Sequence, residues 1–365
     1  MPQRPKDISS PKRHPDSHNK RHPRTGHPGR GMLYVMLALA VMLIVFMLAL
    51  YPVVMTGASK TATIHIARNA TQQMVGDSLT RYFGAGYATK VMRLIRLRKT
   101  DMSKRHGAYE IPEGTNALSA MRKLTSGAQT PSRFTLNGYR SLDSMLERIA
   151  LKFDFSADSL RNALYDPKFL NTYGLSRDNA MAIFLNDSYE AYWSATPEQV
   201  LAKIGDNYAR LWNDGNTAKA KGLGLKPAEV MILASIVDEE TNAPSEKGDI
   251  ARLYINRLNK GMRLQSDPTI RFALNDFTIH RVKGADLNVK SPYNTYMFAG
   301  LPPGPIRTVG RGTVDAILNS RPNNYLYMCA KEDFSGTHNF ATDYEEHMRN
   351  ARRYREALDR RGIIR

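Results

Sequence analysis

The hydrophobic pattern is strongest near the N-terminus, where residues 32–55 contain no charged residue and no polar face. At about 1.5 Å per residue, a helix of this length spans roughly 36 Å, which is enough to cross a bilayer with some tilt. A buried core helix would normally keep a polar face, and a cleaved signal peptide has a shorter apolar region of about 7–15 residues. We therefore predict a retained transmembrane helix over 32–55.

The stretch before this helix has no apolar period. Residues 1–31 are rich in Pro, His, Lys and Arg, a composition typical of a disordered, basic tail. His14, His18 and His22 have a spacing that could suit a metal, but the flanking prolines oppose a helix. We expect a solvated tail here and no metal site.

Alternating and helical patterns follow each other in a short region after the apolar helix. "TATIHIA" at 61–67 alternates like a strand, and two helical stretches cover about 69–83 and 86–98. Residues 107–127 then have the pattern of a strand, a turn and a helix that ends at a glycine. This order predicts a small α+β module over 60–130.

The rest of the chain has a mostly helical pattern. Residues 132–138 are a strand candidate. Helical stretches follow at 141–152, 156–165, 176–183 and 196–217. Turn residues and chemically active side chains are densest over 225–365. We predict α+β as the fold class, with one N-terminal transmembrane helix, the small module, and a larger mixed α+β domain over 131–355.

The charge distribution indicates an orientation for the apolar helix. Residues 1–30 hold eight Lys and Arg against two Asp, so the tail carries +6 of the formal net charge of +18. Only Lys60 and Arg68 lie in the nearest flank after the helix. By the positive-inside rule, the tail lies in the cytoplasm and residues 56–365 lie outside it. This arrangement is typical of a bacterial single-pass protein of the inner, or cytoplasmic, membrane whose large portion is periplasmic or otherwise extracytoplasmic.

Charge and cysteine content restrict the chemistry. The net charge of +12 outside the tail would favour binding to nucleic acid or to polyanionic envelope polymers. The predicted extracytoplasmic location argues against nucleic acid. A single cysteine, Cys329, excludes an intramolecular disulfide and a cysteine-based metal site. The sequence contains no HExxH, GxSxG, Walker A or GxGxxG motif, and His338 and His347 have no metal-binding pattern. We expect no metal and no cofactor.

Three consecutive acids end an apolar helix in "LASIVDEET", residues 233–241. At about 100° per residue, Glu240 lies about 20° from Leu233, in the middle of the apolar face. Asp238 and Glu239 lie about 140° and 120° away on either side, so we predict that both are solvated. A carboxyl on an apolar face has a raised pKa and can serve as a general acid. The alternative, that this last turn leaves the core and exposes Glu240 or pairs it with an arginine, stays open.

Two further stretches supply candidates for a sugar-binding cleft. "QSDPT" contains Gln265 and Asp267, and "SPYNTY" contains Tyr293, Asn294 and Tyr296 beside a rigid Pro/Gly loop. Aromatic faces and amide groups together are what a carbohydrate site needs. A plain turn in the first stretch and a buried tyrosine pair in the second are the alternatives.

Together these stretches resemble the endolytic murein transglycosylases, the MltG or YceG-like family. The resemblance rests on "LASIVDEET", "INRLNKGMRLQSDPTI", "SPYNTY", "GLPPGPI" and "GTHNF", in that order, and covers roughly 100–340. The family's catalytic glutamate precedes the threonine of an E-x-E-T segment, which here is Glu240 before Thr241. The first acid of that segment is Asp238 here, and Glu239 replaces a frequent lysine. The small module resembles the family's LysM-like subdomain.

The resemblance implies cleavage of the peptidoglycan backbone between N-acetylmuramic acid and N-acetylglucosamine without added water. Glu240 would protonate the leaving oxygen and then accept the proton of the muramyl 6-hydroxyl, whose tether gives it a proximity advantage. The product is a 1,6-anhydro end. Contacts to the sugars would come from Gln265, Asp267, Tyr293, Asn294 and Tyr296. The family also implies termination of nascent strands and partnership with peptidoglycan synthases.

Two other functions remain open from the sequence. The first is a hydrolytic muramidase that uses Asp267 as a second carboxyl, whose product would be heavier by one water. The second is a non-catalytic wall-binding protein, which the basic extracytoplasmic portion suggests. Mutation of Glu240 separates catalysis from binding.

Overall fold

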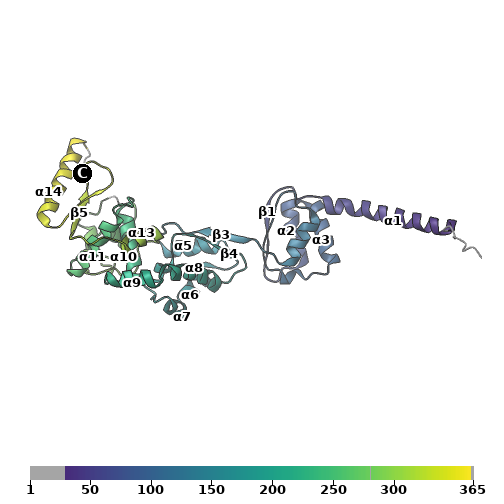
Figure 1. The fold of residues 1–365 in the computed structure, drawn as a ribbon, viewed down its shortest axis with the longest axis horizontal. Helices are drawn as coiled ribbons and strands as arrows, with labels where there is room; N and C mark the ends of the chain where they lie inside the picture. The colour runs from purple at the N-terminus through teal and green to yellow at the C-terminus, as the bar shows by residue number, and fades with distance from the viewer. Residues whose placement is uncertain (1–28, 280, 363–365) are drawn as a thin grey trace, which may run out of the picture. The chain divides into compact units, whose positions relative to one another are not determined.

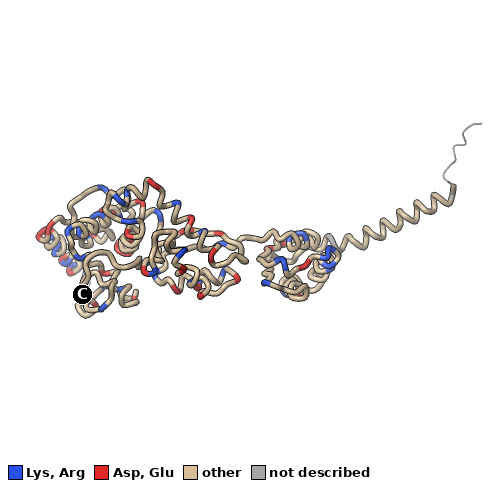
Figure 2. Tube along the Cα trace, turned by 90° about the horizontal axis from the view of Figure 1, so that it is seen from below, with Lys and Arg blue, Asp and Glu red and all other residues tan. Residues whose placement is uncertain are grey.

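The apolar stretch forms one long helix in the computed structural model. Helix α1 runs from Arg30 to Met55, and its window Gly31–Pro52 has a mean hydropathy of 2.9 with no part buried inside the protein. Figures 1 and 2 show this helix, which carries no charged residue after Arg30. Its length and composition suit a membrane span.

The structure describes residues 29–279 and 281–362. The predicted tail therefore lies almost wholly outside the described residues, together with His14, His18 and His22. The chain divides into two compact units, Met1–Thr56 and Gly57–Arg365, and each is described by itself. All site candidates belong to the second unit.

A small module with its own hydrophobic core opens the second unit (Figure 1). Its elements are β1 (Ala62–Ile66), α2 (Gln72–Phe83), α3 (Ala85–Leu97), the 3₁₀ segment η1 (Met102–Lys104), β2 (Gly107–Ile111) and α4 (Ala117–Ser126). β1 pairs antiparallel with β2, and Ile64 lies opposite Tyr109, both fully buried. Gly84, at φ +83°, separates α2 from α3 in a conformation that favours glycine. The predicted order of strands and helices is confirmed, and the likeness to LysM stays a prediction.

The larger domain combines many helices with two antiparallel strand pairs. Its first half contains β3 (Pro131–Thr135), α5 (Leu142–Ala150), α6 (Ala157–Leu164), α7 (Pro167–Thr172), the 3₁₀ segment η2 (Ala180–Ile183), β4 (Ser188–Tyr192), α8 (Pro197–Leu211) and α9 (Asp214–Gly222). Its second half contains α10 (Pro227–Glu240), α11 (Lys247–Asn259), α12 (Asp267–Leu274), the 3₁₀ segment η3 (Asp286–Asn288), α13 (Arg311–Leu318), β5 (Tyr327–Ala330), β6 (His338–Ala341) and α14 (Tyr344–Arg360). β3 pairs with β4, and β5 pairs with β6. The α+β fold class is confirmed.

Several elements differ from the predictions, and three of them show why. The stretch 176–183 contains only the single turn η2 instead of a helix. The predicted helix 196–217 divides into α8 and α9, because the Asn213 side chain caps a new helix. Strand β4 was not predicted, although its residues Tyr189 and Ala191 are buried between exposed neighbours, the alternation of a half-buried strand.

Helix α10 lies in the middle of the larger domain's core (Figure 1). It contacts η2, α9, α11, α12 and α13, and every residue from Val230 to Val237 is buried. The helix therefore has no solvent face, which differs from the predicted apolar stripe. The hairpin of β5 and β6 packs against α14 and places His338 at the start of β6.

Candidate active site

A pocket of about 350 Å³ opens at the C-terminal end of α10. Residues of α10, α11 and α12, the tyrosine-containing loop and the β5–β6 hairpin form its walls. The lining residues are Glu239, Glu240, Leu253, Tyr254, Arg257, Leu264, Gln265, Asp267, Pro268, Arg271, Tyr296, Met328, Cys329, Ala330 and His338. The pocket thus gathers five segments that are separated by up to about a hundred positions in the sequence.

Glu240 is the last residue of α10 and receives two short hydrogen bonds. The hydroxyls of Tyr254 and Ser266 both donate to its Oε1, each at 2.6 Å. Burial raises the pKa of Glu240, the two hydrogen bonds oppose this rise, and the charge of Asp267 adds to it. A carboxyl with a raised pKa can be protonated near neutral pH and act as a general acid.

The two hydroxyl donors come from different elements. Tyr254 lies on α11, and burial together with the Glu240 charge raises its pKa well above the ordinary value, so it stays a donor. Ser266 directly precedes α12, and its backbone N donates to Thr295 Oγ1 at 3.0 Å. The carboxyl of Glu240 is therefore fixed where α10, α11 and α12 meet.

The Pro/Gly loop after Tyr296 holds the middle of α10. Ile306 N donates to Ser235 Oγ at 3.0 Å, and this hydroxyl in turn donates to Ile232 O at 2.7 Å. A Cβ at Gly304 would lie 2.2 Å from the carbonyl oxygen of Asp178, so only glycine allows this approach. The loop thereby fixes the helix that carries Glu240.

Asp238 and Glu239 are not solvated, contrary to the prediction. Lys247 Nζ donates to Asp238 Oδ1 at 2.6 Å, and the Asp238 side chain is 10% exposed. Arg140 donates to both oxygens of Glu239 at 2.7 and 2.9 Å, Arg307 adds a bond of 2.8 Å, and the Glu239 side chain is 8% exposed. The prediction assumed a solvent face on α10, whereas neighbouring elements surround this helix and supply cations to both acids.

Three of the predicted sugar-contacting residues line the pocket with Glu240. These are Gln265, Asp267 and Tyr296. The Tyr296 hydroxyl donates to Asp267 Oδ1 at 2.6 Å, and Asp267 is the first residue of α12. Gln265 is exposed at φ +52°, a left-handed conformation that turns the chain into this helix. A helix begins at Asp267, so the alternative of a plain turn at this position is wrong.

The structure does not bring Tyr293 and Asn294 into this pocket. Asn294 is fully buried, and its Nδ2 donates to Leu287 O at 2.9 Å and to Val289 O at 2.8 Å. Its Oδ1 accepts a hydrogen bond from Tyr296 N at 3.0 Å. Asn294 therefore shapes the loop that presents Tyr296. Tyr293 packs against the ring of Phe272, with 4.6 Å between ring centroids.

Several residues that line the pocket or support its walls were not among the predicted site residues. Glu246 fixes His338, because its Oε1 accepts from His338 N at 2.7 Å and its Oε2 lies 3.1 Å from Nδ1. Arg257 Nη1 donates to Leu264 O at 2.7 Å and so supports the segment before Gln265. The sequence indicates Ser266 only through its position between the candidates Gln265 and Asp267. The sequence pattern around Tyr254 predicts a core residue of its helix and gives no sign of a role in the site.

No metal-binding arrangement is found in the part of the chain that the structure describes, where no cluster of three His, Cys, Asp or Glu side chains could hold an ion. The chemical group that the pocket offers is a protonatable carboxyl between hydroxyl donors. Hydroxyl, amide and aromatic groups surround it, which suits a polar, ring-containing ligand.

Comparisons with known proteins identify the relatives of this chain. The chain is 28% identical over 263 residues to the endolytic murein transglycosylase of Bacillus subtilis (strain 168), which covers 68% of this chain and 72% of that protein. It is 29% identical over 157 residues to the endolytic murein transglycosylase of Streptococcus pneumoniae serotype 2 (strain D39 / NCTC 7466), covering 42% of this chain and 27% of the relative. A crystal structure of a YceG-like protein from Listeria monocytogenes has the same fold, with a TM-score of 0.52 and 22% identity over 80% of this chain and 99% of that one. The profile of the YceG-like family matches residues 64–353, and the protein therefore belongs to the YceG-like family.

Proposed function

We propose that this protein is an endolytic lytic transglycosylase that cleaves peptidoglycan between N-acetylmuramic acid and N-acetylglucosamine. The observation that carries the proposal is the single carboxyl of Glu240, which has a raised pKa and opens into a polar pocket. The relatives named endolytic murein transglycosylases supply the substrate class. The other two acids of the helix end are held in ion pairs, so neither is free to serve as the catalytic acid.

One carboxyl is sufficient when the nucleophile belongs to the substrate. Glu240 donates its proton to the glycosidic oxygen, the bond from C1 to that oxygen breaks, and the N-acetylglucosamine side leaves with a hydroxyl group. The muramyl 6-hydroxyl then bonds to C1, and its proton returns to Glu240. The products are a 1,6-anhydromuramyl end and a free N-acetylglucosamine end, and no water is consumed. The tethered hydroxyl supplies the proximity that an enzyme would otherwise have to create.

Gln265 and Tyr296 bind the sugars, and the other polar groups position these two residues and Glu240. Tyr296 offers an aromatic face, and its hydroxyl is fixed by Asp267. Gln265 is exposed at the rim and offers an amide to hydroxyl or acetamido groups. Ser266 and Tyr254 hold the Glu240 carboxyl in one orientation and stabilise it when it has given up its proton.

The location follows from the apolar helix and the charges around it. We infer that α1 is a single-pass anchor in the inner, or cytoplasmic, membrane, with the N-terminus in the cytoplasm and the catalytic domain outside. The enzyme would then meet nascent glycan strands next to the membrane and end their elongation. Peptidoglycan synthases would be the partners that supply those strands, and no nucleic acid is involved.

Replacement of Glu240 tests the proposal. Glu240→Gln keeps the shape and removes the titrating proton, so turnover should fall by a factor of roughly 10²–10⁴ or more. The assay counts anhydromuramyl ends released from purified glycan strands. Glu198→Gln, an exposed glutamate at the start of α8, is the matched control and should keep full activity. Near-normal turnover of Glu240→Gln would rule out its catalytic role.

A hydrolytic muramidase is the second candidate, because Asp267 lines the same pocket as Glu240. Hydrolysis needs two carboxyls that flank the scissile bond. Mass spectrometry separates the two reactions, because a hydrolytic muramyl end is heavier than an anhydro end by one water. Predominantly hydrolysed ends would favour the muramidase, and Asp267→Asn should then abolish their formation.

A further inference from the structure

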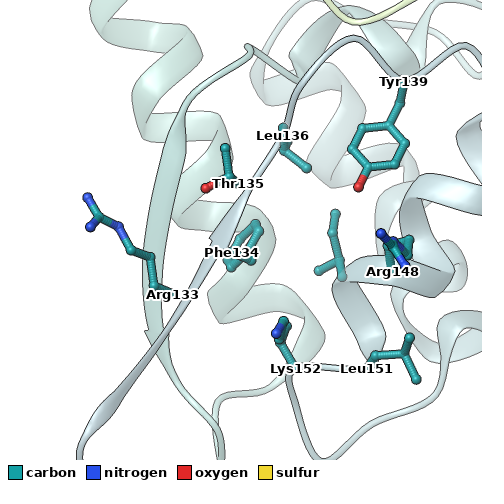
Figure 3. A pocket seen from close by; sticks show the side chains of 9 residues that line it. Arg133, Phe134, Thr135, Leu136, Tyr139, Arg148, Leu151 and Lys152 are labelled. Atoms are coloured by element: carbon teal, nitrogen blue, oxygen red, sulfur yellow. The ribbon is translucent and has the colours of Figure 1, made fainter.

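A second cavity, of about 390 Å³, lies between β3 and α5 (Figure 3). Its lining residues are Arg133, Phe134, Thr135, Leu136, Tyr139, Arg148, Ile149, Leu151 and Lys152. We call it the β3–α5 cavity. It shares no lining residue with the pocket around Glu240. Its apolar floor and charged rim give it the character of a binding site for a small, anionic group.

Two cations on one side of the β3–α5 cavity are unneutralised. Arg148 lies in the last turn of α5, and Lys152 lies two residues past the end of this helix; both side chains are exposed and line the cavity. Neither has an ion-pair partner among the described residues, and no acid is among those that line the cavity. Two like charges that line one cavity repel each other. An anionic ligand would offset this repulsion.

The third cation of the cavity is different. Arg133 extends from β3 away from Tyr139 and Arg148 in Figure 3. Its Nε lies 3.8 Å from an oxygen of Glu190 on the neighbouring strand, so its charge is partly balanced. The pair of Arg148 and Lys152 therefore carries the attraction for an anion.

Apolar and aromatic groups complete the β3–α5 cavity. Leu136 and Ile149 are buried at its floor, and Leu151 is 78% exposed at its edge. No hydrogen bond from the Tyr139 hydroxyl to another described residue is found, and Figure 3 shows this group pointing toward the same space as Arg148. A ligand with both small apolar groups and carboxylates matches this lining.

One short segment connects this cavity to the active site. Tyr139 is fixed by Thr308, since Thr308 N donates to Tyr139 O at 2.8 Å and Tyr139 N donates to Thr308 Oγ1 at 3.0 Å. The next residue, Arg140, forms the two hydrogen bonds to Glu239, which lines the pocket beside Glu240. Consecutive residues of one segment therefore line the β3–α5 cavity and hold a wall residue of the pocket.

We propose that the β3–α5 cavity binds the peptide side chain of the glycan strand through its carboxylates. The inference rests on the proposed function, because it takes peptidoglycan as the substrate. In an intact strand the sugar backbone is uncharged, since the lactyl group of each muramyl residue is an amide, and the negative charge lies on the peptide. Small apolar side chains of that peptide contact Leu136 and Ile149, and its carboxylates pair with Arg148 and Lys152.

The test compares strands that carry peptides with strands whose peptides an amidase has removed. The amidase leaves a lactyl carboxylate on each muramyl residue, so both strands keep charge beside the backbone and differ in the peptide itself. Full-length protein in detergent carries Glu240→Gln, which permits binding without cleavage. Addition of Arg148→Gln and Lys152→Gln should weaken binding of the peptide-bearing strands by roughly 3- to 10-fold, the size expected for two exposed ion pairs. Binding of the stripped strands should not change.

The matched control removes two exposed charges elsewhere on the domain. Lys203→Gln with Arg321→Gln should leave binding of both strands unchanged. Equal weakening of both strands by the Arg148 and Lys152 changes would place the sugars in this cavity and overturn the proposal. Unchanged binding of the peptide-bearing strands would overturn it as well. Because binding is measured without turnover, a failure of the catalytic proposal appears separately, in the assay for anhydromuramyl ends.

Discussion

A single oxygen of Glu240 receives both of its hydrogen bonds. The hydroxyls of Tyr254 and Ser266 donate to Oε1 and favour the charged carboxylate, whereas burial favours the neutral acid. The balance of these effects leaves a raised pKa. A group that gives a proton in one step and takes one back in the next works best when its pKa lies near the working pH. The two hydroxyls therefore tune the catalytic group as well as orient it.

Removal of one donor should shift the pH dependence of the reaction. Because the Tyr254 hydroxyl lowers the pKa of Glu240, Tyr254→Phe should raise that pKa further. The high-pH limb of kcat/KM, where the acid loses its proton, then moves to higher pH. A hydrogen bond to a charged group contributes about 1.5–3 kcal/mol, so the shift should be about one to two pH units. The measurement is a pH profile of anhydromuramyl-end formation at low substrate concentration.

Tyr208→Phe is the control for this change. Tyr208 lies on α8, is buried, and its hydroxyl has no hydrogen-bond partner among the described residues. Removal of the Tyr208 hydroxyl should not shift the pH profile of kcat/KM. If the high-pH limb of the Tyr254→Phe profile stays at the wild-type position or moves to lower pH, the assigned role of the hydrogen bond is contradicted.

Stability should also depend on Glu240 in a pH-dependent way. Its pKa is raised in the folded protein above the ordinary value of 4.5, so the neutral form is favoured by folding. The resulting stability is present in full below pH 4.5 and is lost as the pH rises through the raised pKa. The side chain of Glu240→Gln does not titrate. The melting temperature of this variant should therefore increase relative to that of the wild type as the pH rises from 4 to 8. Scanning calorimetry at several pH values measures this, and a constant difference would contradict the raised pKa.

At the scale of elements, the sequence of α10 predicts the position of Glu240 but not the surroundings of Asp238 and Glu239. Glu240 follows Leu233 by seven positions, which is close to two helical turns. The helical periodicity alone therefore places Glu240 on the same face as the core residue Leu233. The same reasoning fails for Asp238 and Glu239, because a helix surrounded by other elements has no solvated side. The cations that neutralise these acids come from distant parts of the chain, and local periodicity carries no information about them.

Loops are less predictable for a related reason. The segment "SPYNTY" contains three candidate residues, and only Tyr296 reaches the pocket. Asn294 turns inward because its amide satisfies the carbonyl groups of Leu287 and Val289. The side chains that a loop presents depend on such backbone contacts, which residue type and spacing do not specify. Residue type identified the segment as a candidate, and the structure separates the roles of its members.

The ion pairs of Glu239 should stabilise the end of α10. Glu239→Gln leaves Arg140 and Arg307 without their carboxylate, and the free energy of unfolding should fall by about 1–3 kcal/mol. The effect is smaller than for a fully buried pair because the Arg140 side chain is 43% exposed. Urea denaturation measures the change. Glu190→Gln, whose pair with Arg133 is exposed, should change stability by less than about 0.5 kcal/mol, and equal effects would contradict the prediction.

At the scale of the whole molecule, charge is distributed unevenly along the chain. Residues 57–130 contain twelve Lys and Arg against four Asp and Glu, which is two-thirds of the excess positive charge outside the tail. Ten of these twelve Lys and Arg lie beyond Arg68, whereas residues 1–30, at the N-terminal end of the apolar stretch, hold eight. The positive-inside rule weighs the residues near the ends of the span, and folded domains cross the membrane largely regardless of their charge. The basic module therefore does not oppose an extracytoplasmic location.

The orientation of α1 decides whether the proposed substrate is accessible at all. Alkaline phosphatase, which is active only outside the cytoplasm, should be active when fused after Lys60. A fluorescent protein that matures only in the cytoplasm should be dark at the same position and bright at the N-terminus. Exchange of the eight Lys and Arg of residues 1–30 for Gln should reduce the phosphatase signal, because the charge asymmetry is what sets the orientation. Fluorescence after Lys60 in the unaltered chain would place Glu240 in the cytoplasm, away from mature glycan strands, and the proposed cleavage of peptidoglycan would then have to be abandoned along with the anchor's orientation.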